Sequence, residues 1–182
     1  SLYNETNGLS IYPTPILGMV GLIEPVDQVT TQWFKNPGDR IILLGETKED
    51  LGGTEYLKVV HYREQGSPPL LNFENEKALQ GCLLKMIENG SIQSAHDCSD
   101  GGLAVALAEC CFAPLVVKGS PLGADLQLDA AGLRTDALLF GETPSRSVLS
   151  VSPNAAPNVL SLAKEYGVAA SEIGYVGGDS LR

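Results

Sequence analysis

The chain of 182 residues has the length of one ordinary domain, with room for a piece of a neighbouring domain. Hydrophobic residues make up 43% and charged residues 19%, a composition typical of globular rather than disordered chains. The formal net charge is −10, with 22 acidic against 12 basic residues, so the protein's field repels polyanions such as DNA and RNA. Nucleic-acid binding is therefore not expected.

Neither a membrane protein nor a disulfide framework is expected. The chain has no apolar run approaching about 18 residues and no basic-then-apolar leader, so we expect a cytoplasmic protein without membrane contact. It begins with Ser1 rather than Met, and we expect it to have been cut from a longer polypeptide. The cysteines form no C-x-x-C pair, and we predict reduced, mostly buried thiols, because free cysteine behaves as a small hydrophobic side chain. They are Cys82, Cys98, Cys110 and Cys111.

Hydrophobic runs and glycines predict the first elements along the chain. Residues 16–23 and 41–44 are short apolar runs, which predict two buried strands. Gly52-Gly53 is expected to open a helix that extends to Tyr62.

The middle of the chain gives the clearest helical pattern. Apolar side chains recur at helical spacing over residues 74–89, between a capping Asn72 and a terminating Gly90. A strand is predicted at 92–96. Residues 103–112 predict an almost wholly apolar helix, which we expect to be buried on all sides.

Later segments give weaker patterns, and the alternation of strands with helices predicts a layered α+β domain resembling α/β folds. The predicted segments are a loop at 113–123, strands at 124–128, 148–151 and 173–176, and a helix at 158–166.

The segment between the strand at 92–96 and the apolar helix carries the most chemistry. Two carboxylates and a hydroxyl, from Asp97, Asp100 and Ser99, precede Gly101 and Gly102. The glycines allow a tight turn and close approach of a ligand to the N–H groups at the helix start. Oxygen ligands three residues apart suit Mg²⁺, which binds through one or two carboxylates together with substrate phosphates.

Simpler interpretations of these residues stay open. Asp100 can cap the helix while Asp97 merely ends the strand, because Asp-Gly turns before helices are common. Gly52-Gly53 repeats the pattern of a turn leading into a helix, and a structural turn is favoured there. Neither His61 nor His96 has a partner at metal-ligand spacing, which argues against a zinc site.

Four segments occur in a distinctive order: SLYNET at residues 1–6, PTPILG at 13–18, LLG followed by LGGTEYL within 43–57, and AHDCSDGGLA at 95–104. In this order and spacing they resemble the last part of the phosphoribosylformylglycinamidine synthases, a family within the aminoimidazole ribonucleotide synthetase superfamily. The resemblance is strongest up to about residue 112 and looser beyond it.

The resemblance implies a domain plan and an activity. Whole enzymes of this family carry two tandem A-plus-B domain pairs, so residues 1–36 would be the end of the second A domain and 37–182 the second B domain. The B domain has the C-terminal domain fold of the superfamily. The implied reaction converts formylglycinamide ribonucleotide, ATP and glutamine-derived ammonia into formylglycinamidine ribonucleotide, ADP and phosphate, with Mg²⁺. The implied partners are a glutaminase domain or subunit and, in the small form, a bridging subunit.

The resemblance also implies roles for single residues. Ser1 matches the family's substrate-binding serine, Asp97 a metal-binding aspartate of the first B domain, and Glu142 a ligand-contacting glutamate there. The family's catalytic histidine and ATP-contacting lysine lie in the first half of the enzyme, so we expect no catalytic residue here and an inactive fragment.

The chain departs from the family pattern after Glu142. It has Thr143-Pro144-Ser145 where the first copy has Ser-Gln-Glu, and Pro144 cannot supply the side-chain amide that reads substrate. We therefore expect a structural site or an auxiliary, noncatalytic Mg–nucleotide site. Its candidate ligands are Asp97 and Asp100 for the metal and Ser99, Gly101 and Gly102 for ATP or ADP. A related ATP-dependent synthetase or kinase of the superfamily is the third hypothesis.

Overall fold

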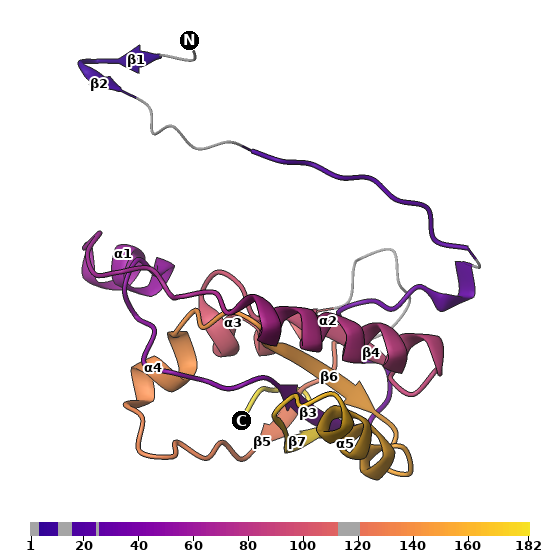
Figure 1. Cartoon of the computed structure of the whole chain (residues 1–182). Coiled ribbons are helices and arrows are strands. Elements are labelled where there is room, and N and C mark those ends of the chain that lie inside the picture. The colour runs from indigo at the N-terminus through magenta and orange to yellow at the C-terminus, as the bar shows by residue number, and fades with distance from the viewer. Residues whose placement is uncertain (1–3, 11–15, 25, 113–120) are drawn as a thin grey trace.

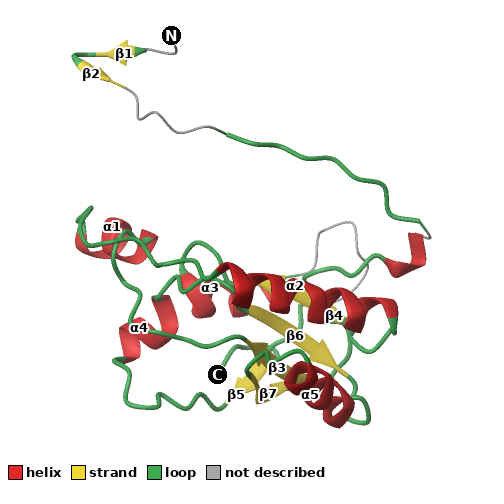
Figure 2. Ribbon diagram, in the orientation of Figure 1, coloured by secondary structure: helices red, strands yellow, loops and turns green. Residues whose placement is uncertain are grey.

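The structure is a computed structural model that describes residues 4–10, 16–24, 26–112 and 121–182. Its body is a five-stranded sheet in the order β4-β6-β3-β7-β5, in which every neighbouring pair is antiparallel. Helices cover the sheet (Figures 1 and 2), so the layered α+β prediction is confirmed. The strands are β3 (Arg40–Leu44), β4 (Ser94–Asp97), β5 (Ala124–Leu126), β6 (Ser147–Val151) and β7 (Ala170–Val176). The helices are α1 (Glu55–His61), α2 (Phe73–Glu88), α3 (Gly102–Cys110), α4 (Thr135–Phe140) and α5 (Ala156–Glu165).

The central strand β3 is buried on both faces. Ile41 and Leu43 pack with residues of α3, whereas Ile42 and Leu44 pack with residues of α2 and α5. Successive side chains of a strand point to opposite faces, so a continuous apolar run is what a strand between two cores requires. The strand predicted at 41–44 is therefore confirmed.

The caps of α2 are those that the sequence predicts. Asn72 Oδ1 accepts hydrogen bonds of 3.0 Å from the backbone N–H groups of Glu74 and Asn75. Gly90 follows the helix with a φ of 63°, a left-handed conformation that glycine adopts without strain. Cys82 of this helix is buried in the layer between α2 and the sheet, and the other three cysteines lie in the layer on the α3 side. All four are free thiols, as predicted, and three of them are buried.

Burial on all sides, which we expected for the helix at 103–112, is wrong. α3 buries Leu103, Leu107 and Cys110 against the sheet, but Val105 is 37% exposed and Glu109 faces solvent. A helix that covers one face of a sheet has one covered side, so its small apolar residues on the other side meet water. Burial raises the pKa of the Cys98 thiol, in the same layer, to about 11.

The buried strand predicted at residues 16–23 is also wrong. This segment forms no strand, and it leads away from the body of the molecule toward the hairpin of β1 (Glu5–Thr6) and β2 (Leu9–Ser10) (Figure 1). Ile16 and Met19 are 95% and 98% exposed. An apolar run becomes a strand only when another strand pairs with it, and no described residue does so.

Smaller differences concern short elements. β5 has three residues rather than the predicted five, and its outer edge pairs with the C-terminus, where Ala124 forms a parallel bridge with Leu181. α4 and the 3-10 turn η1 (Val26–Gln28) were not predicted. Of the loop predicted at 113–123, residues 113–120 lie outside the described part. No helix of the described part is long and apolar enough to cross a membrane.

The turn that begins β3 generates a pH prediction. Asp39 is 4% exposed, its carbonyl accepts from Val176 N, and its carboxylate accepts from Asn36 Nδ2 at 3.2 Å. Burial raises the pKa of Asp39 above its usual 3.8. The folded state therefore binds this proton more tightly than the unfolded state, and stability falls as pH rises from about 3.8 through the raised pKa.

We expect Asp39→Asn to lack this loss. The melting temperature of the variant minus that of the wild type should increase with pH across the window, because all other titrations cancel in the difference. Asp179→Asn removes a carboxylate at an exposed position and is the matched control for the loss of one acidic side chain. A flat or decreasing difference for Asp39→Asn would contradict the assignment.

Candidate functional site

The predicted bend between strand and helix is present between β4 and α3. Gly101 and Gly102 have φ values of 80° and 69°, in the left-handed region that favours glycine. The neighbouring atoms also leave no room for a side chain at either glycine. A Cβ atom on Gly102 would lie 2.5 Å from Gly141 O, and one on Gly101 would collide with Val105. The bend thus requires both glycines.

Asp97 ends β4 with its side chain 74% exposed. Its carboxylate accepts a hydrogen bond from the Ser99 hydroxyl, and His96 Nδ1 lies 3.5 Å from Oδ1. The hydrogen bond from Ser99 is the main cause that lowers the pKa of Asp97, and His96 adds to it. Asp97 is therefore an ionised, accessible carboxylate at neutral pH.

Asp100 does not cap α3, so the simpler interpretation of that residue is wrong. The N-cap is Gly101, which has no side chain for the purpose, and Asp100 is exposed. The N–H of Gly101 donates instead to Glu142 Oε1 at 2.8 Å. The N–H of the N-cap residue is thus bound by a residue far along the chain, which no local pattern indicates.

Glu142 holds a second helix start with the same oxygen. The backbone N–H of Glu55, the first residue of α1, donates to Oε1 at 2.9 Å. One carboxylate oxygen therefore joins the turn at Gly52-Gly53 to the turn at Gly101-Gly102. The two helix starts that follow the same glycine pattern thus share one acceptor, with Glu55 as the donor at α1 and Gly101 as the donor at α3.

The loop that carries Glu142 is fixed by a buried arginine that the sequence analysis missed. Arg146 is 2% exposed, and its guanidinium donates to Gly141 O at 2.6 Å and to Thr143 O at 2.9 Å. A third bond, of 3.1 Å, reaches Thr47 Oγ1. Burial lowers the pKa of Arg146, and hydrogen bonds to carbonyls compensate for the lost water.

A groove of about 440 Å³ lies between α2 and this loop, a size found for ligand pockets. Glu76, Asp97, Ser99 and Ser145 are among its polar residues. Both Glu76 oxygens are engaged, one by Gln80 Nε2 at 2.7 Å and the other by Ser145 Oγ at 2.6 Å. Asp97 is thus the accessible carboxylate of the groove.

The carboxylate in this groove offers part of a ligand set for Mg²⁺ and not a site built from protein ligands alone. Among the described residues, no group of three or more His, Cys, Asp or Glu side chains is arranged to hold a metal ion. Mg²⁺ usually keeps several waters and takes one or two carboxylates together with phosphate oxygens. Asp97 lines the groove and offers one such carboxylate, whereas Asp100 is exposed and is not among the residues that line it.

The remaining predicted site residues are placed as follows. Ser1 lies outside the described residues. The N–H of Gly101 donates to Glu142, and that of Gly102 donates to Ser99 O at 3.0 Å. A phosphate would meet these two N–H groups only after exchange with acceptors of the chain itself, whereas the Ser99 hydroxyl is exposed.

The antiparallel sheet covered by helices, with its glycine bend before α3, defines an α+β domain of the type found at the C-terminus of AIR-synthase-related proteins. The chain belongs to the family AIR synthase related protein, C-terminal domain, whose model matches residues 36–181.

The resemblance found in the four sequence motifs is confirmed by curated relatives. The chain is 48% identical over 181 residues to the phosphoribosylformylglycinamidine synthase subunit PurL of Moorella thermoacetica. It is 46% identical over 185 residues to that of Anaeromyxobacter sp. (strain Fw109-5). All of this chain is covered in both cases, and it spans 24% of the length of each relative.

Solved structures agree on the fold. Phosphoribosylformylglycinamidine synthase II from Thermotoga maritima matches with a TM-score of 0.65 and 25% identity, over 84% of this chain and 24% of that one. Thiamine-monophosphate kinase from Stenotrophomonas maltophilia matches with a TM-score of 0.52 and 15% identity, over 85% and 52%. The second likeness shows the fold alone.

The double hydrogen bond at Glu142 generates a stability prediction. Glu142→Ala leaves two backbone N–H groups without their acceptor, and we expect it to destabilise the domain by roughly 1–3 kcal/mol. Glu142→Gln keeps a carbonyl oxygen and should lose clearly less. Urea unfolding measures the difference, and hydrogen exchange at the amides of Glu55 and Gly101 should be accelerated together in the alanine variant. Acceleration at one amide alone would contradict the shared acceptor.

Proposed function

We propose that this chain is the second B domain, with the end of the preceding A domain, of a phosphoribosylformylglycinamidine synthase. The observation that carries the proposal is 46–48% identity along the whole chain to PurL subunits four times its length. Residues 37–182 form the B domain and residues 1–36 the connection. The exposed apolar side chains of residues 16–24 support this division, because such a segment gains cover from polypeptide beyond the chain.

The whole enzyme acts in the cytoplasm as an ATP-dependent ligase of purine biosynthesis. ATP phosphorylates the amide oxygen of formylglycinamide ribonucleotide, and ammonia then displaces the phosphate to give the amidine, ADP and phosphate. Solved Thermotoga maritima structures named PurL complexed with ATP and PurL complexed with FGAR support the substrates. The structure named PurLQS supports an assembly with further subunits. In our proposal one of these subunits is a glutaminase that supplies ammonia.

Within that enzyme this chain contributes binding rather than chemistry. Ser1 contacts the ribonucleotide, while Asp97 and Asp100 hold Mg²⁺ against the phosphates of a bound nucleotide. Ser99, Gly101 and Gly102 lie where those phosphates meet the bend. Pro144 removes the side-chain amide that reads substrate in the first copy, so this auxiliary site stabilises the enzyme and does not turn over.

The first test is turnover by the isolated chain. With formylglycinamide ribonucleotide, ATP, Mg²⁺ and ammonium present, we expect no release of ADP above the background of ATP alone. The complete PurL of Moorella thermoacetica under the same conditions is the positive control, and a cooperative thermal transition shows that the chain is folded. Sustained ADP release that depends on the ribonucleotide would overturn the proposal of a noncatalytic domain.

The second test is binding of Mg–ADP, measured by calorimetry. We expect the chain to bind ADP only with Mg²⁺ present, and Asp97→Asn to weaken binding about tenfold or more, since it removes the ionised ligand. Asp179→Asn removes a charge elsewhere on the surface and should bind like the wild type. Equal affinity of both variants would refute the assigned metal ligand, and no heat from the folded wild type would refute the auxiliary site.

A further inference from the structure

Asparagine is followed directly by glycine at two places in the chain, Asn7-Gly8 and Asn89-Gly90. In such a pair the backbone nitrogen of the glycine reaches the side-chain amide of the asparagine easily, because glycine has no Cβ to block the approach. Both pairs are exposed, and no atom beyond the neighbouring residues lies within 4 Å of the place that a Cβ would take at either glycine. Steric access therefore does not distinguish the two pairs.

Asn7-Gly8 forms the turn of the hairpin between β1 and β2. The two residues have φ values of 53° and 80°, as in a type I′ turn, and each strand has only two residues. The hairpin lies away from the body of the molecule (Figure 1), and all of its residues are exposed. A two-stranded hairpin without a core is marginally stable in water, so we expect this turn to open readily.

Asn89-Gly90, in contrast, is fixed by the end of α2. The Gly90 N–H donates to Ile87 O at 2.9 Å. The next N–H, of Ser91, donates to Met86 O at 2.9 Å, and Met86 is fully buried. The Gly90 nitrogen is thus held by a helix that is anchored in the core, whereas the Gly8 nitrogen has no hydrogen bond within the described part of the chain.

We propose that Asn7 is a site of spontaneous deamidation through a succinimide, and that the fold protects Asn89 from the same reaction. The Gly8 backbone nitrogen attacks Asn7 Cγ and forms a C–N bond. The bond from Cγ to Nδ2 breaks, and Nδ2 leaves as ammonia with the proton of the Gly8 N–H. Water then opens the ring at Cγ to give isoaspartate's isomer aspartate only when the new C–N bond is cleaved there, and opening at the backbone carbonyl of residue 7 gives isoaspartate. Water is the only co-reactant, and nothing is oxidised or reduced. The inference does not depend on the proposed function.

The isoaspartate product changes the hairpin itself. Its backbone runs through Cβ, so the turn gains one atom, and a two-residue turn of this type no longer closes in register. Both products also add a negative charge to a chain whose net charge is already −10. No residue of the hairpin belongs to either core cluster, so we expect the reaction to unpair β1 and β2 and to leave the main sheet unchanged.

The test is peptide mapping by mass spectrometry after incubation of the complete folded chain at mildly alkaline pH. We expect acid to accumulate at residue 7 about tenfold or more faster than at residue 89, since opening the hairpin costs less free energy than opening the helix end. Incubation in concentrated urea is the control for flanking sequence, and there both sites should react at similar rates. No acid at residue 7, equal rates in the folded chain, or an unchanged preference in urea would each overturn the proposal.

Matched variants assign the ammonia that is released. Asn7→Ser should remove the fast phase of ammonia release from the folded chain. Asn89→Ser changes the other pair in the same way and should leave that phase unchanged. Both positions are exposed, so neither substitution removes a buried side chain. A fast phase that survives Asn7→Ser would place the reaction at another amide and refute the site.

Discussion

The arrangement of the candidate site depends on a single carboxylate oxygen. Glu142 Oε1 accepts from the first N–H of α1 and from the N–H that starts α3, at 2.9 and 2.8 Å. α1 has no buried residue, so packing alone cannot fix it. Besides Glu142, it is held by the parallel stacking of Tyr56 on Phe140, with ring centres 4.8 Å apart. The buried guanidinium of Arg146 donates to the carbonyls of Gly141 and Thr143, and these bonds hold the backbone on both sides of Glu142 in place.

This interaction also bears on what the bend can bind. An N–H group at a helix start attracts anions, and here a carboxylate of the same chain already accepts from Gly101. An incoming phosphate competes with a tethered acceptor whose effective concentration is high. A cation bound by the exposed Asp97 carboxylate meets no such competitor, because a carboxylate that accepts from the Ser99 hydroxyl still has free lone pairs. A metal-dependent auxiliary site is thus more compatible with the geometry than a glycine-rich phosphate loop.

The sequence predicted those features that depend on local pattern. The apolar run of β3, the capped periodicity of α2 and the turn at Gly101-Gly102 follow from side-chain spacing and backbone freedom, and all three were predicted correctly. The contacts that build the site have another origin. Glu142 lies 87 residues from Glu55, and Arg146 lies 99 residues from Thr47, so only the folded chain brings them together. The errors have the same cause, since burial of residues 16–23 and of both sides of α3 depends on what packs against them.

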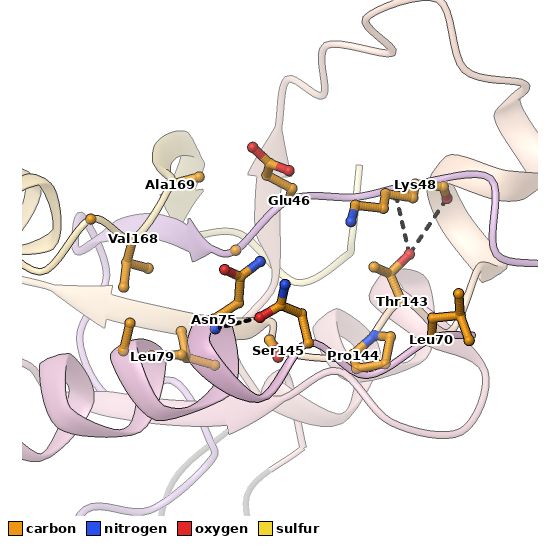
Figure 3. Close-up of a pocket in the computed structure, with 14 residues that line it drawn as sticks. Glu46, Lys48, Leu70, Asn75, Leu79, Thr143, Pro144, Ser145, Val168 and Ala169 are labelled. Atoms are coloured by element: carbon orange, nitrogen blue, oxygen red, sulfur yellow. Dashed lines mark hydrogen bonds between the residues drawn. The ribbon is translucent and has the colours of Figure 1, made fainter.

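Ser145 shows how these constraints combine. It follows Pro144 with a φ of 58°, a conformation that costs a non-glycine residue on the order of 1–3 kcal/mol and persists only where the surroundings enforce it. Here the Ser145 hydroxyl is held by Glu76, and the next residue, Arg146, is fixed by three hydrogen bonds. Pro144 and Ser145 border both the 440 Å³ groove and a second cavity of about 140 Å³ (Figure 3), so the strained Ser145 belongs to the wall between the two spaces. Relaxing Ser145 would move that wall, and the volumes of the groove and of the cavity would change together.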